Sequence, residues 1–386
     1  MSEVRSCPGL VSAHSHAFQR AIRGRTEQPS GVGQDTFWTW REAMYQAANR
    51  LSPEDIYDVS RMTFLEMALA GITAVGEFHY LHNAPDGTRY DDSNLLAKQV
   101  IRAATDVGLR IVLLNTAYVR GGQPRFLTPS IDDFIRDTED LRGCSTELVS
   151  IGVAPHSVRA VPLDYLRGVI GYAQTNDLPI HMHVAEQPAE IEVCLDEYGM
   201  RPVELLYRND LLSSSFTGVH VIHVIEDEIG YLAETGARVC ACPTTERNLG
   251  DGAVPADRYF DRGVPVCLGS DSNVQIDILE DARELEYHLR MKRLERALLE
   301  PDGLFNSATQ AGRESLKLPA NKDYFTVDPN DPSIAGGADI VFSTGRSAIR
   351  DVYVNGRQLV GNGRHAQQDE IIARFKAVQK RSFRPN

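Results

Sequence analysis

The chain has 386 residues, of which 42% are hydrophobic, 24% charged and 8% aromatic, as in globular proteins with a large buried core. This composition excludes a disordered or collagen-like chain. Forty basic against 53 acidic residues give a net charge of −13, which argues against binding of nucleic acid or an anionic membrane through a general basic field.

Short apolar runs rich in β-branched residues alternate with longer segments of helical periodicity. The runs predict strands over residues 10–13, 72–75, 111–114, 149–154, 179–182, 217–219, 239–241 and 266–269. Helices are expected between them, for example over residues 53–70 with Ser52 as the N-cap, and over residues 95–107 before Gly108. Eight alternations of strand and helix predict a (β/α)8 barrel, the TIM barrel of the α/β class.

The chain changes character after the expected barrel. Residues 277–299 predict a long charged helix, and residues 302–318 predict another helical stretch. Residues 338–343 and 352–354 then predict strands, and Asn355-Gly356 predicts a hairpin that leads into a strand over residues 357–360. We therefore expect a small sheet beside the barrel.

Polar residues stand at the carboxyl ends of the predicted strands. They are His14 and His16, followed by Glu77, Tyr118, His156, His183, His220, Thr244 and Asp271. In barrels of this kind the active site is built at that face from the ends of several strands. Five histidines and an aspartate at matching ends therefore predict a site there, although polar residues are also common where strands become loops.

Three histidines and one aspartate form a candidate metal site. His14 and His16 are two residues apart at a strand end, so both rings project to the same side and can share one ion. In the second pair, His181 and His183, only His183 is near enough to the strand end to reach that ion. Asp271 ends the eighth strand, beside the first strand once the barrel closes. These ligands suit a zinc-like divalent ion that keeps a position open for water and lowers the pKa of that water to about 7.

Two further residues are candidates for proton transfer. Glu186 lies three residues beyond His183, near enough to pass a proton to the group under attack, although it could also be a surface carboxylate that opens the next helix. His220 could orient or polarise the electrophile, and His223 is the weaker candidate for this role. Asp271 could hold the ion, accept the proton of the attacking water, or do both. The fourth strand has no lysine that could bridge a second metal.

The chain resembles the amidohydrolase superfamily and, within it, the formimidoylglutamate deiminases of histidine degradation. The resemblance runs from Pro8 to about His365. It is carried by HSHAFQR (14–20), FWTWRE (37–42), GITAVGEFHY (71–80), HSVRAV (156–161), HMHVAEQ (181–187), TTERNLGDG (244–252) and GSDS (269–272). The histidine pair and GSD occur in many hydrolases, whereas HSHAFQR, FWTWRE and HSVRAV are much more specific to this family.

The resemblance implies a hydrolase acting on C–N bonds of linear amidines, which converts N-formimino-L-glutamate to N-formyl-L-glutamate and ammonia with a metal-bound hydroxide. It implies that His14, His16, His183 and Asp271 bind one divalent ion, with Zn²⁺ expected, although iron and manganese also fit such a site. It also implies that Glu186, His220 and Asp271 are catalytic. The residues expected to hold the substrate are Gln19, Arg41, Tyr118, His156 and Arg159.

The two arginines also make chemical sense without the resemblance. The expected substrate carries two carboxylates, and arginine is the side chain best shaped for bidentate capture of a carboxylate. In a chain of net charge −13, such a dianion needs placed arginines. We expect Trp38 and Trp40 to pack around this loop rather than take part in the chemistry.

Two other functions are weighed against this one. The same metal site could serve a deaminase of a guanine-type or other heterocyclic amidine, but a neutral base needs no pair of arginines such as Arg41 and Arg159. A catalytically inactive scaffold that acts by assembly is the third alternative. Such relatives typically lose metal ligands, and this chain keeps all four.

The sequence departs from the family pattern in three places. The first strand is expected at Leu10, whereas the family usually has a longer N-terminal segment that joins a β-sandwich. We therefore expect an N-terminally reduced β-sandwich, with residues 1–7 as its remnant, residues 8–320 as the barrel and residues 321–386 as the C-terminal sandwich segment and tail. The loop after Tyr118 is shorter, which could alter substrate preference. Asn273 stands where a histidine is common.

The expected partner is a small-molecule substrate, with no nucleic acid and no membrane. The six cysteines form no CxxC pair, which favours reduced thiols. The N-terminus lacks the apolar core of a signal peptide, and no stretch reaches the roughly 18 apolar residues of a membrane span. We expect a cytoplasmic protein. The oligomeric state is left open, and a homodimer is suggested only by how common dimers are among soluble proteins.

Overall fold

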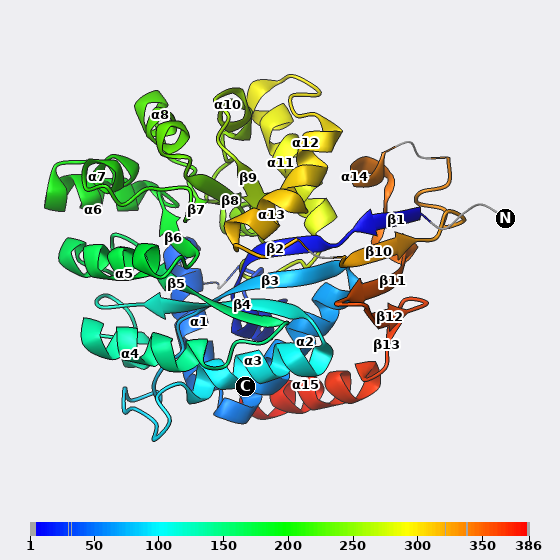
Figure 1. Cartoon of the computed structure of the whole chain (residues 1–386), viewed down its shortest axis with the longest axis horizontal. Coiled ribbons are helices and arrows are strands. Elements are labelled where there is room, and N and C mark those ends of the chain that lie inside the picture. Colours follow the sequence, from blue (N-terminus) through cyan, green and yellow to red (C-terminus); the bar gives the residue numbers. More distant parts are fainter. Residues whose placement is uncertain (1–4, 30, 32, 321, 337–338, 384–386) are drawn as a thin grey trace.

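Eight parallel strands form the centre of the structure, a computed structural model that describes residues 5–29, 31, 33–320, 322–336 and 339–383. The strands follow one another in chain order around the sheet (Figure 1). They are β2 (Leu10–Ser15), β3 (Ile72–His79), β4 (Arg110–Ala117), β5 (Val149–Pro155), β6 (Ile180–Val184), β7 (Phe216–His220), β8 (Arg238–Ala241) and β9 (Val266–Leu268). Each overlaps a predicted strand, so the (β/α)8 barrel is confirmed.

The barrel closes between its first and last strands. Ser15 at the end of β2 forms a parallel bridge with Asp271, which follows β9. The N–H of His16 donates to the carbonyl oxygen of Asp271 at 2.9 Å, and the N–H of Asp271 donates to the carbonyl oxygen of His14 at 3.0 Å. Closure therefore brings the two ends of the predicted metal site together.

Helices lie between the strands along the chain, and most of them cover the outside of the barrel (Figure 1). They are α1 (Phe37–Arg50), α2 (Pro53–Leu69), α3 (Leu95–Val107), α4 (Ile131–Arg142), α5 (Leu163–Thr175), α6 (Pro188–Tyr198), α7 (Pro202–Arg208), α8 (Glu226–Thr235), α9 (Pro243–Leu249) and α10 (Ala256–Asp261). Short 3-10 turns are η1 (Ala17–Ile22), η2 (Pro124–Phe126) and η3 (Arg346–Ala348).

Two local predictions about helix ends are confirmed. Ser52 caps α2, because its side chain accepts from the N–H of Asp55 while Asp55 accepts from the N–H of Ser52. Helix α3 ends at Gly108, whose φ of 88° lies in the left-handed region that favours glycine.

The helices after the barrel are shorter than predicted. Helix α11 (Ile278–Arg293) is capped by Asp277 and ends where Leu294 adopts a φ of 59°, so it does not reach residue 299. The stretch over residues 302–318 is divided into α12 (Pro301–Ser307) and α13 (Gln310–Ser315), because Thr309 between them leaves the helical conformation.

A five-stranded antiparallel sheet lies beside the barrel (Figure 1). Its order is β1 (Arg5–Pro8), β10 (Tyr324–Val327), β11 (Ile349–Val354), β12 (Arg357–Gly361) and β13 (Arg364–His365). Asn355 and Gly356 turn the β11–β12 hairpin with φ values of 50° and 73°, as their sequence predicts. Helix α15 (Gln368–Ser382) packs against α2.

The predicted strand over residues 338–343 is wrong. Residue 338 lies outside the described residues, and Ile340–Ser343 is the short helix α14. A local hydrogen bond explains the helix: the side chain of Asp339 accepts from the N–H of Phe342 at 2.8 Å and starts a helical turn.

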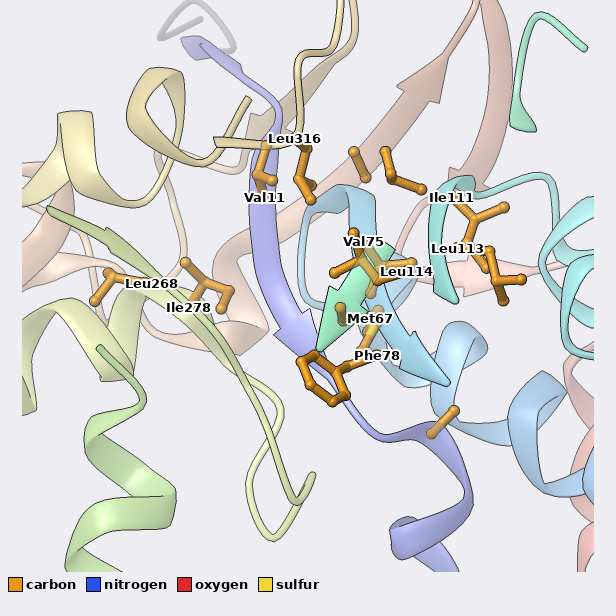
Figure 2. Close-up of a cluster of buried hydrophobic side chains, with 14 of the residues drawn as sticks. Val11, Met67, Val75, Phe78, Ile111, Leu113, Leu114, Leu268, Ile278 and Leu316 are labelled. Carbon is orange, nitrogen blue, oxygen red and sulfur yellow. The ribbon is translucent and has the colours of Figure 1, made fainter. Parts of the chain in front are cut away.

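Apolar side chains from neighbouring strands and helices form a continuous core. Figure 2 shows a part of it that includes Val11 from β2, Val75 from β3 and Leu113 from β4, all at most 1% exposed. This packing holds the strand ends, and therefore the side chains that follow them, in fixed positions. Among the described helices, none combines the length and apolar character that crossing a membrane requires.

Candidate active site

The four predicted metal ligands converge on one point at the carboxyl end of the barrel. The Nε2 atom of His14 lies 3.1 Å from Nε2 of His16 and 3.2 Å from Nε2 of His183. The Oδ1 atom of Asp271 lies 3.4 Å from Nε2 of His14 and 3.3 Å from Nε2 of His16. All four side chains are buried, so β2, β6 and the end of β9 form a closed cluster of metal-ligand type.

Hydrogen bonds on the outer side of the rings fix which nitrogen faces this point. Nδ1 of His16 donates to the carbonyl oxygen of Phe78 at 2.9 Å, and Nδ1 of His183 donates to that of His156 at 3.1 Å. A carbonyl can only accept, so both Nε2 atoms present lone pairs to the centre of the cluster. The Nε2 lone pairs of His16 and His183 and the carboxylate of Asp271 thus face one another at short distance, an arrangement that a cation between them would stabilise. The donor set therefore fits a divalent metal ion.

The protonation states in the cluster are those that a metal ion requires. Burial lowers the pKa of His14 to about 3 and also lowers the pKa values of His16 and His183, so the rings are neutral at pH 7. Burial opposes ionisation of Asp271, but its hydrogen bond with His14 and the other nearby histidines hold its pKa below the usual range. Three neutral imidazoles and one carboxylate face the same point.

Glu186 and His220 lie beside the cluster. Nε2 of His220 is 3.7 Å from Oε1 of Glu186 and 3.7 Å from Oδ2 of Asp271. Burial opposes protonation of His220, but the carboxylates of Glu186, Glu246 and Asp271 outweigh it and raise the pKa of His220 to about 10. Three titratable side chains are thus placed side by side at the ligand cluster, at distances slightly beyond hydrogen-bond range.

Glu246 is a site residue that the sequence did not single out, although it lies within the TTERNLGDG segment. Its Oε1 atom is 3.2 Å from Nδ1 of His220 and accepts from the N–H of Cys242 at 2.8 Å. The buried carboxylate therefore holds the His220 ring with Nε2 directed at Glu186 and Asp271. His220, Cys242 and Glu246 also have metal-ligand spacing, but these hydrogen bonds already account for their contacts.

All five residues expected to hold the substrate line one pocket with the ligand cluster. Gln19 donates to Tyr80 Oη at 2.8 Å, and Tyr118 Oη lies 3.0 Å from Tyr45 Oη. The ring of His156 lies against Tyr118, with centroids 4.3 Å apart. The pocket is lined by His16, Gln19, Phe37, Trp40, Arg41, Met44, Tyr45, Tyr80, Tyr118, Arg120, Gly121, His156, Ser157, Arg159, Ala160, His183, Glu186, His220, Leu249 and Asp271.

The two predicted arginines differ in their surroundings. Arg41 on α1 lies over the ring of Trp38, 4.5 Å from its centroid, and makes no ion pair with any described residue. Arg159 contacts Glu186 at 3.0 Å and Glu190 at 3.2 Å. Of these two arginines, Arg41 is therefore free of a carboxylate among the described residues and Arg159 is already paired.

The two histidines that the sequence marks as weaker candidates make contacts with backbone carbonyl groups. His181 does not reach the ligand cluster, and its Nε2 atom lies 3.2 Å from the carbonyl oxygen of Ser315. His223 contacts the carbonyl oxygen of Asp251 at 2.9 Å. Trp40, which we expected to pack only around the loop, lines the pocket, and Arg120 adds a third arginine that the sequence did not single out.

Comparison with known proteins agrees with this geometry. The model of the amidohydrolase family matches residues 6–359. Formimidoylglutamate deiminase of Pseudomonas aeruginosa is 36% identical over 96% of this chain and 88% of its own length. The crystal structure of an amidohydrolase from Brucella melitensis is 34% identical, with a TM-score of 0.89 over 98% of this chain and 90% of that one.

A more distant structure shares the fold. Atrazine chlorohydrolase from Arthrobacter aurescens, complexed with zinc, is 23% identical, with a TM-score of 0.87 over 97% of this chain and 88% of that one. The family match, the identity to the deiminase and the barrel with its ligand cluster agree, and this chain belongs to the amidohydrolase family.

Proposed function

We propose that this protein is a formimidoylglutamate deiminase, which hydrolyses N-formimino-L-glutamate to N-formyl-L-glutamate and ammonia in histidine degradation. The observation that carries the proposal is the position of Arg41 and Arg159 in the same pocket as the ligand cluster. A linear substrate with an amidine at one end and two carboxylates at the other matches this arrangement. The Pseudomonas aeruginosa relative supports it.

His14, His16, His183 and Asp271 would hold one divalent ion, and we propose zinc. Three imidazole nitrogens and one carboxylate suit zinc, and the chlorohydrolase that shares the fold is complexed with zinc. When bound, such an ion lowers the pKa of a water molecule to about 7 and so supplies a nucleophile at neutral pH.

The side chains around the cluster would move the protons. Asp271 accepts the proton that the attacking water loses as its oxygen bonds to the formimino carbon, while His220, protonated because its pKa is raised to about 10, orients and polarises the electrophile. Glu186 delivers a proton to the terminal nitrogen as the electron pair of the C=N bond moves onto it. Asp271 then passes the water proton to this nitrogen while the hydroxyl group on the carbon gives its proton back to Glu186, so that the carbon–nitrogen bond breaks, ammonia leaves, and the carbon remains as a formyl group. One water is consumed for each ammonia released.

Release of ammonia from N-formimino-L-glutamate by purified protein with added zinc tests the proposal. We expect release that stops after treatment with a chelator and returns when zinc is added back. Guanine serves as the second substrate, because the heterocyclic alternative expects ammonia from it. Ammonia from guanine alone, or no ammonia from either substrate with zinc bound, would reject the deiminase.

The division of the chain into domains is also a proposal. Residues 8–320 would form the catalytic barrel, with residues 1–7 and 321–386 in the accessory part. The cytoplasmic location and the homodimer stay predictions, which fractionation of cells and the mass of the protein in solution would test.

A further inference from the structure

Arg159 is paired with the residue expected to transfer the proton. Its Nη2 atom donates to Oε2 of Glu186 at 3.0 Å, and its Nε atom lies 3.2 Å from Oε2 of Glu190. The side chains of Arg159, Glu186 and Glu190 are 14%, 7% and 0% exposed. The guanidinium thus lies between two carboxylates in the wall of the pocket.

The two carboxylates are held differently. Glu190, in the first turn of α6, accepts from the N–H of Ala185 through Oε1 at 2.8 Å, so its position is fixed by the backbone. The carboxylate of Glu186 accepts a hydrogen bond from Arg159, and its contact with His220 is longer at 3.7 Å. Glu190 is therefore an anchor for Arg159, whereas Glu186 is held mainly by Arg159 itself.

The geometry of arginine makes this pairing relevant to the substrate. A carboxylate bound in bidentate fashion uses two parallel N–H groups of the guanidinium. Nε forms an ion pair with Glu190 at 3.2 Å but no hydrogen bond, and Nη1 makes no hydrogen bond with a described residue. Nη2 has two N–H groups and Glu186 uses one of them, so a substrate carboxylate on the edge formed by Nη1 and Nη2 either takes that N–H or lies directly beside the carboxylate of Glu186.

We propose that binding of a substrate carboxylate to Arg159 displaces Glu186 and thereby releases it for proton transfer. Repulsion between the incoming carboxylate and Glu186 drives the exchange, while Glu190 keeps the guanidinium in place. Arg159 then determines specificity through turnover as well as affinity, because an amidine without a carboxylate leaves Glu186 paired. This inference rests on the proposed function.

The first test compares N-formimino-L-glutamate with N-butylformamidine, which has the same reacting group and no carboxylate. With the zinc-loaded enzyme, we expect the kcat of N-butylformamidine to be lower by about tenfold or more, and added propionate to raise it. Equal kcat values, with only KM higher for the truncated amidine, would overturn the inference.

The variant Arg159→Gln distinguishes release of Glu186 from simple binding of the substrate by Arg159. We expect this variant to turn over N-butylformamidine faster than the wild type and to lose the response to propionate, while its KM for N-formimino-L-glutamate rises. An unchanged kcat for the truncated amidine would mean that Arg159 only binds substrate, and a lower kcat would mean that it only positions Glu186; either result rejects the inference. Glu192→Gln, an exposed position on the same helix as Glu190, is the matched control and leaves both rates unchanged.

A crystal structure of the zinc-loaded enzyme with glutarate gives a readout that does not depend on turnover. We expect glutarate on Arg159, the distance between Nη2 and Glu186 beyond hydrogen-bond range, and the contact between Nε and Glu190 retained. Glutarate bound to Arg159 with the Glu186 contact intact, or glutarate that leaves Arg159 unoccupied, would reject the exchange. If no amidine releases ammonia, the proposed function fails, while this structure still tests the exchange.

Discussion

The side-chain amide of Asn273 donates to the carbonyl oxygen of His16 at 3.1 Å. The same nitrogen lies within hydrogen-bond distance of Ser15 Oγ and of the carbonyl oxygen of Asp271, and Oδ1 accepts from Ser270 at 2.9 Å. Asn273 therefore ties the loop after β9 to the end of β2, between two expected metal ligands. Its φ of 57° suits asparagine better than most other residues.

Asn273→Ala is expected to lower the free energy of unfolding by about 2–4 kcal/mol, because several buried hydrogen bonds are lost together. Zinc affinity is expected to fall as well, since the two strand ends are no longer tied. Asn355→Ala is the control, because Asn355 has a similar φ of 50° in an exposed turn. Urea unfolding measures the free energy of unfolding of both variants. If both lose the same amount, the Asn273 amide does not have the proposed role.

Gly269→Ala is expected to disrupt the ligand cluster. A Cβ atom at residue 269 would lie 2.7 Å from Cβ and 2.9 Å from the carbonyl oxygen of His14, and the backbone there cannot move without shifting the ring. We expect less bound zinc per protein, measured by metal analysis after dialysis. Gly230→Ala in α8 meets no atom within 4 Å, so it should keep full zinc content and gain about 0.5–1 kcal/mol of stability. Full zinc content in Gly269→Ala would contradict the steric argument.

Glu186→Gln is expected to retain zinc and lose turnover by about 10²-fold or more, because it removes a proton donor without changing the ligand cluster. Measurement of kcat together with zinc content separates the two effects. Near-normal turnover in this variant would count against proton transfer by Glu186.

Arg41→Lys is expected to raise the KM for N-formimino-L-glutamate by about tenfold or more with a smaller effect on kcat, because lysine cannot form the planar pair with a carboxylate or stack in the same way on Trp38. Steady-state kinetics measure this effect. Arg50→Lys, at the exposed end of the same helix, is the control. If both variants have the wild-type KM, Arg41 does not bind the substrate.

The stability of the metal-free protein is expected to fall as the pH falls from about 6.5 to 4. Burial lowers the pKa of His181 from 6.5 to about 4, so in this range the unfolded chain binds a proton that the folded chain does not. The stability that the neutral His181 ring contributes is fully present above pH 6.5, the pKa of this histidine in the unfolded chain. It is lost as the pH falls towards about 4, the pKa in the folded chain.

His181→Phe should make this slope shallower by up to about 1.4 kcal/mol per pH unit. Urea unfolding at pH 6.5, 5.5 and 4.5 in the presence of a chelator measures the slope. The same slope in variant and wild type would show that His181 does not titrate in this way.

The sequence predicts the barrel well because its signals are local and repeated. Each buried strand is an apolar run, and the polar residue after it marks the face where His14, His183 and Asp271 meet. Helix capping by Ser52 is also local, because both partners of the capping box lie within one turn.

Contacts between distant loops leave no such signal. The pairing of Arg159 with Glu186 joins the loops after β5 and β6, and neither residue type reveals which partner it meets. Helix α14 shows the same limit, since the apolar run of three residues, Ile340–Phe342, is equally compatible with a strand, and the hydrogen bond that Asp339 accepts decides for a helical turn.

Closure of the barrel also sets an order of events during synthesis of the chain. Ser12 on β2 lies 2.9 Å from Ser270, its partner 258 residues later, and β1 pairs with β10. A ribosome that makes the chain from its N-terminus therefore exposes β1 and β2, the latter with its apolar Leu10 and Val11, long before β10 and β9 exist. Until then these strands can pair with other nascent chains, so rapid production of the protein should favour aggregates, and slower translation should favour the native enzyme.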